Sequence, residues 1–237
     1  MEQQLSSHKK VIKTISKERE RTNILRQPEQ NLIAFLVQRI PAWIKPDGLT
    51  AIGLFGSIVS MASFILAYYV HTAYLLLGIL GLFINWFGDS LDGRVAYYRN
   101  TPRKWYGFTL DYIVDWFSNI LISIGFIMYV QSSARFLGFA FLALYGWTMM
   151  MALLRYKLTN RYSIDSGFLG PTEVRLVIAT MLLLEVLING SIVYSGVLIC
   201  IILLTVNLID FRKILLVADR KDKREKIEKR NKERENE

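Results

Sequence analysis

The chain has 237 residues, of which 52% are hydrophobic, and a formal net charge of +9. Its apolar residues are too clustered for one soluble domain, and its positive charge comes without a nucleic-acid-binding motif, so we expect no nucleic-acid partner. A single cysteine, Cys200, excludes a disulfide framework within the chain, and two widely separated histidines, His8 and His71, argue against a zinc site.

The N-terminal part of the chain is polar and then amphipathic. Residues 1–29 are basic, show no cleavable signal peptide, and are predicted to form a cytoplasmic extension. In residues 30–45 apolar side chains recur at helical spacing, which predicts an amphipathic helix lying in the membrane interface. Pro41 and Pro46 would end this helix and turn the chain inward.

Long apolar runs make up most of the remaining chain, and each is near the ~20 residues that a membrane helix requires. They lie at roughly 49–70, 73–95, 108–131, 134–155, 171–189 and 192–215. We therefore predict an all-α integral membrane protein with six transmembrane helices and an N-terminal interfacial helix. Its membrane domain would cover residues 30–215.

The last segment, residues 216–237, is rich in charged residues of both signs. Opposite charges often fall three or four residues apart, which favours a solvated helical tail continuing from the last membrane helix. An anchor for anionic lipids is the alternative.

The distribution of basic residues predicts the orientation. Of the 29 Lys and Arg, only Arg135 lies at or beside the connections expected after the first, third and fifth membrane helices. The positive-inside rule then places both termini, and the connections at 96–107 and 156–170, in the cytoplasm.

Four aspartates lie in one short window of this apolar chain. Asp89 and Asp92 are three residues apart at the end of the second run, on one face of a helix. Asp111 and Asp115 are four residues apart near the start of the third run. Ionisable groups in membrane helices generally mark a functional site. Four converging carboxylates require cations, and an all-oxygen ligand set favours Mg²⁺ or Mn²⁺.

This arrangement also indicates a class of chemistry. Two divalent ions held by four carboxylates could clamp a pyrophosphate and stabilise both the attacked phosphorus and the departing phosphate. Gly93 and Gly107 lie near the carboxylates and would let a planar group and its phosphates approach the backbone. The pattern therefore predicts phosphoryl-type transfer at the cytoplasmic membrane face.

The same residues resemble the motif D-x2-D-G-x2-A-R-x8-G-x3-D-x3-D of the CDP-alcohol phosphatidyltransferases, a family with a six-helix membrane fold. The matching residues, in order, are Asp89, Asp92, Gly93, Ala96, Gly107, Asp111 and Asp115. Tyr97 stands where the family has an arginine, and the spacer to Gly107 is one residue longer. Arg94 and Arg99 are candidates to replace that arginine. The segment Ile40–Thr50 is also similar to the start of the family's membrane domain.

The resemblance implies a CDP-linked donor that an alcohol attacks at phosphorus, with release of CMP. Asp89, Asp92 and Asp111 would hold the metal ions, and Asp115 would act as the general base and as a further ligand. The residues implied in nucleotide binding are Gly93, Ala96, Arg99 and Gly107.

Three further charged residues lie near the cytoplasmic end of the predicted bundle. Arg155 follows the fourth helix, and Glu173 and Arg175 lie in the first turns of the fifth. We predict that they contribute to binding the acceptor, where cations would pair with a phosphate. Alternatively, Glu173 and Arg175 form an ion pair or an anchor at the membrane interface. The positive-inside rule alone would then explain Arg155.

The predicted function is phospholipid biosynthesis, with CDP-diacylglycerol as the expected donor. A CDP-ethanolamine or CDP-choline type phosphotransferase acting on diacylglycerol or a ceramide-like lipid is the alternative. Tyr97 leaves a catalytically silent homologue open, and the acidic cluster leaves a divalent-cation carrier open. A carrier would place polar groups near the bilayer midplane, however. The expected partners are the lipid bilayer, the donor and the acceptor, and a homodimer is open; the expected location is the inner or plasma membrane of a prokaryote.

Overall fold

Helices form every regular element in the part of the chain that the computed structural model describes, which is residue 12, residues 25–159 and residues 170–235. The elements are α2 (Arg26–Val37), α3 (Pro46–Tyr69), η1 (Thr72–Tyr74), α4 (Leu75–Tyr98), α5 (Lys104–Tyr129), η2 (Ser133–Arg135), α6 (Phe136–Thr159), α7 (Pro171–Leu187) and α8 (Ser191–Glu235). The predicted all-α class is confirmed. Most of the predicted N-terminal extension and part of the connection at 156–170 lie outside the described residues.

Five of these helical segments are long and apolar enough to cross a membrane. They comprise α3, η1 with α4, α5, η2 with α6, and α8. The predicted fifth span corresponds to α7, which has 17 residues and is the shortest of the six helices in the bundle. The chain is therefore a multi-pass membrane protein, while the predicted total of six spans depends on α7.

The closest helix packing is between α3 and α4, and glycines make it possible. A Cβ atom at Gly81 would lie 2.5 Å from Ser60 Oγ, and one at Gly56 would collide with the backbone of Asn85. At the other end of the same contact, a Cβ atom at Gly88 would collide with the backbone of Gly53. Small residues at helix contacts in membranes let the backbones approach. This contact fixes the end of α4 that carries Asp89 and Asp92.

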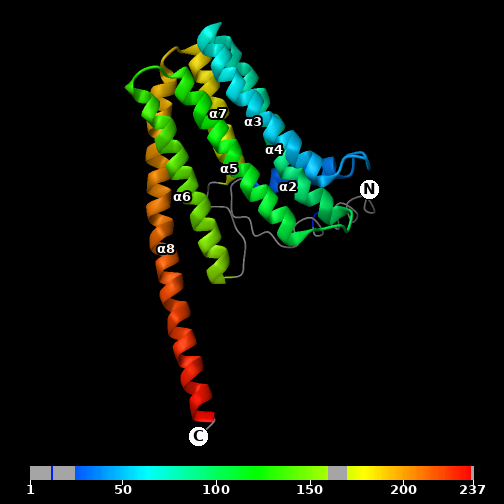
Figure 1. Ribbon diagram of the computed structural model, residues 1–237, viewed down its shortest axis with the longest axis vertical. Helices are drawn as coiled ribbons and strands as arrows, with labels where there is room; N and C mark the ends of the chain where they lie inside the picture. Colours follow the sequence, from blue (N-terminus) through cyan, green and yellow to red (C-terminus); the bar gives the residue numbers. More distant parts are fainter. Residues whose placement is uncertain (1–11, 13–24, 160–169, 236–237) are drawn as a thin grey trace.

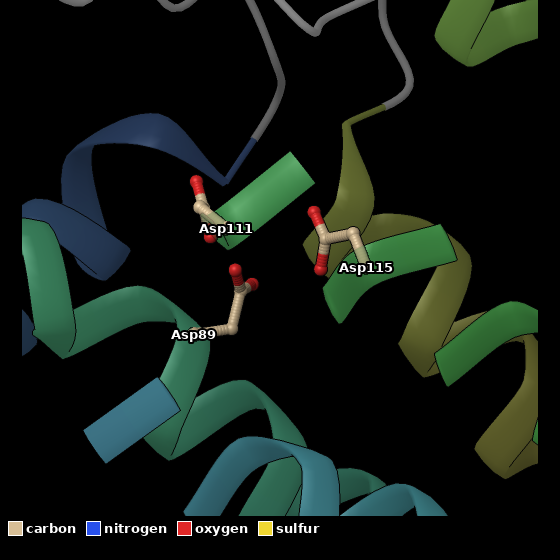
Figure 2. A group of neighbouring side chains, drawn as sticks. All are labelled: Asp89, Asp111 and Asp115. Carbon is tan, nitrogen blue, oxygen red and sulfur yellow. The ribbon is translucent and has the colours of Figure 1, made fainter. Parts of the chain in front are cut away.

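The two halves of the aspartate motif belong to consecutive helices that pack mainly on other helices. In the described structure, α4 packs on α3 and α7, whereas α5 packs on α3 and α6. Both helices pack on α3, which is therefore their shared support. Asp89 of α4 points toward Asp111 and Asp115 of α5 (Figure 2).

A helix is observed in the predicted region, but this helix, α2, begins at Arg26 and ends at Val37 rather than covering residues 30–45. Ile33, Ala34 and Val37 are buried against Leu91 and other residues of a small apolar cluster. Leu32 and Phe35 are exposed on the other side of the helix. The guanidinium of Arg39 lies over the Phe35 ring, 3.4 Å from its centroid.

The last helix, α8, continues through the predicted boundary at residue 215 and has 45 residues. No Gly or Pro follows Gly196 in this segment to interrupt it. Ion pairs with i, i+4 spacing, Asp219 with Lys223 and Glu233 with Lys229, lie on its charged half. This half extends beyond the other helices, as Figure 1 shows. The predicted helical continuation of the tail is confirmed up to Glu235.

Candidate active site

Three of the four predicted aspartates converge. Asp89 comes from α4, and Asp111 and Asp115 come from successive turns of α5. One carboxylate oxygen from each lies within 4.8 Å of the other two. Figure 2 shows Asp89 pointing toward the two α5 carboxylates across the space between the helices. Asp111 is buried, and Asp89 and Asp115 are partly buried.

Asp92 lies one turn beyond Asp89 on α4 and has a different environment. Its carboxylate accepts a hydrogen bond of 2.7 Å from Thr50 Oγ1 on α3 and another from the backbone N–H of Gly93. Only 5% of the residue is exposed. Among the described residues, the group within 4.8 Å contains Asp89, Asp111 and Asp115 but not Asp92. α3 therefore orients this fourth carboxylate beside the cluster.

One cation reaches into the acidic cluster from α7. Arg175 Nη2 lies 2.7 Å from Asp89 Oδ2 and 3.8 Å from Asp115 Oδ1. Its Nε donates a hydrogen bond of 2.7 Å to Asn85 Oδ1. Only 14% of the Arg175 side chain is exposed, so these charges meet where water screens them weakly. The guanidinium joins α4, α5 and α7 at the site.

Asn85 is the residue that the sequence prediction missed. Its side-chain NH₂ lies within hydrogen-bond distance of Gly53 O at 3.1 Å, Ser57 Oγ at 3.0 Å and Ser118 Oγ at 3.4 Å. These acceptors belong to α3 and α5, while the Asn85 oxygen faces Arg175 of α7. An amide inside an apolar run was the available signal, because polar side chains within membrane helices often bridge neighbouring helices.

The predicted nucleotide-binding residues have several different environments. Gly93 adjoins Asp92, and Ala96 is 8% exposed. Gly107 is exposed, and a Cβ atom added to it would have no neighbour within 4 Å. The surroundings of Gly107 thus offer room for a ligand.

The basic residues around the end of α4 hold backbone and loop segments. Arg99 donates hydrogen bonds to the carbonyl oxygens of Ile40, Pro41 and Ile44, at 3.1, 2.9 and 2.6 Å. Arg94 is buried and donates to Ser90 O at 2.7 Å. Arg103 pairs with Asp47 at the start of α3, and this hydrogen bond raises the pKa of Arg103. The contacts of Arg99 fix the segment between α2 and α3.

The other two predicted acceptor residues also have structural partners. Glu173 accepts hydrogen bonds of 3.0 Å from the backbone N–H groups of Gly170 and Leu25, and it therefore caps α7 and ties the start of α2 to it. Arg155 on α6 forms an ion pair of 2.9 Å with Asp210 on α8. Arg175, by contrast, forms ion pairs with the aspartate cluster.

The donor set fits a divalent cation. Carboxylate oxygens are ligands that Mg²⁺ and Mn²⁺ prefer, and three of them approach one another here from two helices. Among the described residues, Arg175 contributes one positive charge to this group of three carboxylates. The site can therefore attract a cation and, through it, a phosphate.

Comparison with known proteins gives the family. The profile of the CDP-alcohol phosphatidyltransferases matches residues 43–208, which is most of the chain and includes all four aspartates. The chain belongs to this family. Divalent metal ions are used throughout the family, in agreement with the acidic cluster.

Two curated relatives are cholinephosphotransferases from vertebrates. Cholinephosphotransferase 1 of Danio rerio is 30% identical over 166 residues, covering 63% of this chain and 40% of the relative. Cholinephosphotransferase 1 of Xenopus laevis is 25% identical over 170 residues, covering 68% of this chain and 41% of the relative. The chain thus matches only about two fifths of the length of these relatives.

Proposed function

We propose that the chain is a metal-dependent membrane transferase of phospholipid biosynthesis. It would move a phosphatidyl or phospho-alcohol group from a CDP-linked donor to an alcohol acceptor and release CMP. The observation that carries this proposal is the convergence of Asp89 with Asp111 and Asp115. These residues come from the two halves of the family motif and meet in space although their helices pack mainly on others.

The four aspartates have distinct roles in this proposal. Asp89, Asp111 and Asp115 hold divalent ions, Mg²⁺ or Mn²⁺, and Asp92, oriented by Thr50, completes the set. When bound, two such ions would neutralise the charge of the donor's pyrophosphate and of the departing CMP. Gly93, Ala96 and Gly107 are the proposed nucleotide-binding residues, and Gly107 has open space around it.

Asp115 is the proposed general base. It takes the proton of the acceptor hydroxyl while that oxygen forms a bond to the donor phosphorus. The bond from this phosphorus to the oxygen of CMP breaks, and CMP leaves with the electron pair. The family motif assigns this role to Asp115, and its side chain is 20% exposed, so that an acceptor hydroxyl can reach it.

Two donor classes are candidates. CDP-diacylglycerol is the donor expected from the motif. The names of the two relatives favour the second class, in which CDP-choline or CDP-ethanolamine donates to diacylglycerol or a similar lipid. Of the predicted acceptor-binding residues, Arg175 has the strongest support, because Glu173 and Arg155 are engaged by Gly170 and Asp210.

The proposed topology has six spans, with α7 as the fifth, and both termini and the aspartates on the cytoplasmic side. The asymmetry of the basic residues supports it, since Arg135 is the only one at or beside the connections on the other side. The exposed face of α2 would lie against the lipid headgroups. A homodimer and a prokaryotic membrane remain predictions from the sequence, and both relatives named above are vertebrate proteins.

The test is an assay of CMP release by the purified chain. CDP-diacylglycerol, CDP-choline and CDP-ethanolamine are supplied separately with Mn²⁺ and a mixture of alcohol acceptors, and the lipid product is identified by mass spectrometry. Release with one donor and formation of the matching phospholipid support the proposal. Binding of Mn²⁺ without CMP release from any donor would instead indicate a silent homologue or a carrier.

A further inference from the structure

Arg175 occupies a constrained position within the acidic cluster. Its Nε is held by Asn85 Oδ1 at 2.7 Å, and its Nη2 lies on Asp89 at 2.7 Å and near Asp115 at 3.8 Å. Two separate contacts, one through Nε and one through Nη2, fix the orientation of the planar guanidinium. The side chain is largely buried, with 14% exposed.

The contacts of Asn85 explain why its amide can hold this arginine. Three acceptors from α3 and α5 surround the Asn85 NH₂ group, which leaves the amide oxygen facing α7. Reversing the amide would place its oxygen against the carbonyl oxygen of Gly53 and its NH₂ against the Arg175 Nε–H. The network therefore selects the orientation in which Asn85 accepts from Arg175.

The positive charge of Arg175 affects how the aspartates can bind a cation. Carboxylates that approach one another at low exposure repel unless a positive charge lies among them. Arg175 supplies such a charge to Asp89 and Asp115 through the chain itself. A divalent ion bound by the same two carboxylates would be repelled by the guanidinium and would compete with it for Asp89.

We propose that Arg175, positioned by Asn85, is a built-in counter-ion that competes with the divalent cation for Asp89 and Asp115. Cation binding releases Nη2 from Asp89 while Nε stays on Asn85, so that the guanidinium becomes available to a phosphate of the substrate. This inference rests on the proposed function, because it takes the three aspartates as the cation site. In this arrangement Asn85 is a positioning residue. The Arg175 contacts that stabilise the metal-free protein also lower its affinity for the cation.

The test is calorimetric titration of the purified full chain in detergent with Mn²⁺ alone. Arg175→Gln removes the competing charge and should tighten Mn²⁺ binding at least about fivefold, the lower end of typical coupling between two sites. Arg175→Lys keeps a positive charge near the carboxylates and should bind Mn²⁺ more weakly than Arg175→Gln does. Thr148→Val is the matched control, because it removes a partly buried hydrogen bond to Asn207 between α6 and α8 and should leave Mn²⁺ affinity unchanged.

A double-variant cycle tests the role of Asn85. Asn85→Ala should tighten Mn²⁺ binding in the chain that contains Arg175, because the arginine is no longer held against Asp89. The same change should have no effect on Mn²⁺ affinity when Arg175→Gln is already present. Equal effects of Asn85→Ala in both backgrounds would show that Asn85 acts on the cation without Arg175 and would overturn its positioning role.

Thermal unfolding provides an independent readout. Without metal, Arg175→Gln should lower the unfolding midpoint, because the carboxylates lose their counter-ion, and saturating Mn²⁺ should remove most of this difference. If Arg175→Gln folds only in Mn²⁺, the same conclusion follows. Suppose that the wild type binds Mn²⁺ and releases CMP, but Arg175→Gln binds Mn²⁺ no more tightly than the wild type does. This result would overturn the competition between Arg175 and the cation and would leave the proposed function intact. A wild type that binds no Mn²⁺ would overturn the proposed function as well.

Discussion

At the scale of single residues, neighbouring contacts give chemically identical side chains different roles. Asp92 is buried and held by Thr50, whereas Asp115 is partly exposed and faces Asp89 and Arg175. The first environment suits a carboxylate with a fixed position. The second suits one that must meet an acceptor hydroxyl.

This contrast predicts different effects of the same substitution. Asp115→Asn should lower turnover by at least the ~100-fold typical of losing a general base, with a smaller loss of donor affinity. Asp92→Asn should weaken donor binding and turnover together, because it alters the carboxylate that Thr50 orients. Donor binding by calorimetry and CMP release are measured on the same purified variants. If Asp115→Asn and Asp92→Asn lose donor affinity equally, Asp115 acts mainly as a metal ligand and not as the base.

The sequence predicts the carboxylates better than it predicts the cations. Aspartates inside apolar runs are costly, so their presence alone points to a site. Basic residues at the cytoplasmic membrane edge are common for other reasons, and Arg99, Arg155 and Arg175 look alike in sequence. Their partners differ because backbone carbonyls, Asp210 and Asp89 respectively lie within reach, and those neighbours depend on tertiary packing.

At the scale of helices, the position of the site depends on the glycine contact between α3 and α4. This contact aligns Asn85, Asp89 and Asp92 with their supports on α3, among them Gly53 and Thr50. α5 uses the same helix as its support. A disturbance of α3 should therefore affect both halves of the motif.

Gly56→Ala tests this packing. Its Cβ atom would collide with the backbone of Asn85, and overpacking of this kind typically costs about 1–3 kcal/mol. The unfolding midpoint in detergent should fall, and CMP release should fall with it. Gly48→Ala is the control, since a Cβ atom at Gly48 would meet nothing within 4 Å. Equal midpoints for the two variants would contradict the close approach of α3 and α4.

The sequence predicted the membrane helices of the bundle well, but it predicted the ends of the interfacial and C-terminal helices less well. Apolar runs identified the helices of the bundle, because spanning a membrane requires continuous apolar length. The ends of α2 and α8 do not obey this rule. α2 begins at Arg26, ahead of the predicted start and next to the tie between Leu25 and Glu173, and α8 continues because its charged half has no helix breaker.

At the scale of the whole molecule, the charge distribution predicts which side of the membrane holds the site. Single cysteines at the exposed positions Thr101 and Ala73, introduced into a Cys200→Ala background, report this directly. A membrane-impermeant thiol reagent should label Thr101→Cys only from the cytoplasmic side and Ala73→Cys only from the opposite side. The reverse pattern of labelling would overturn the proposed orientation.

The proposed transferase activity requires the converged aspartates to hold divalent cations. The most direct test is CMP release from the accepted CDP-linked donor, as a function of Mn²⁺ concentration, by the wild type and by Asp111→Asn. Removing this buried ligand should lower turnover by at least about 100-fold and weaken Mn²⁺ binding, comparable to the loss of other preorganised electrostatic groups. Asp219→Asn, the same change on the exposed half of α8, should leave both unchanged. Full turnover and unaltered Mn²⁺ dependence in Asp111→Asn would show that the aspartate cluster does not hold the catalytic cations.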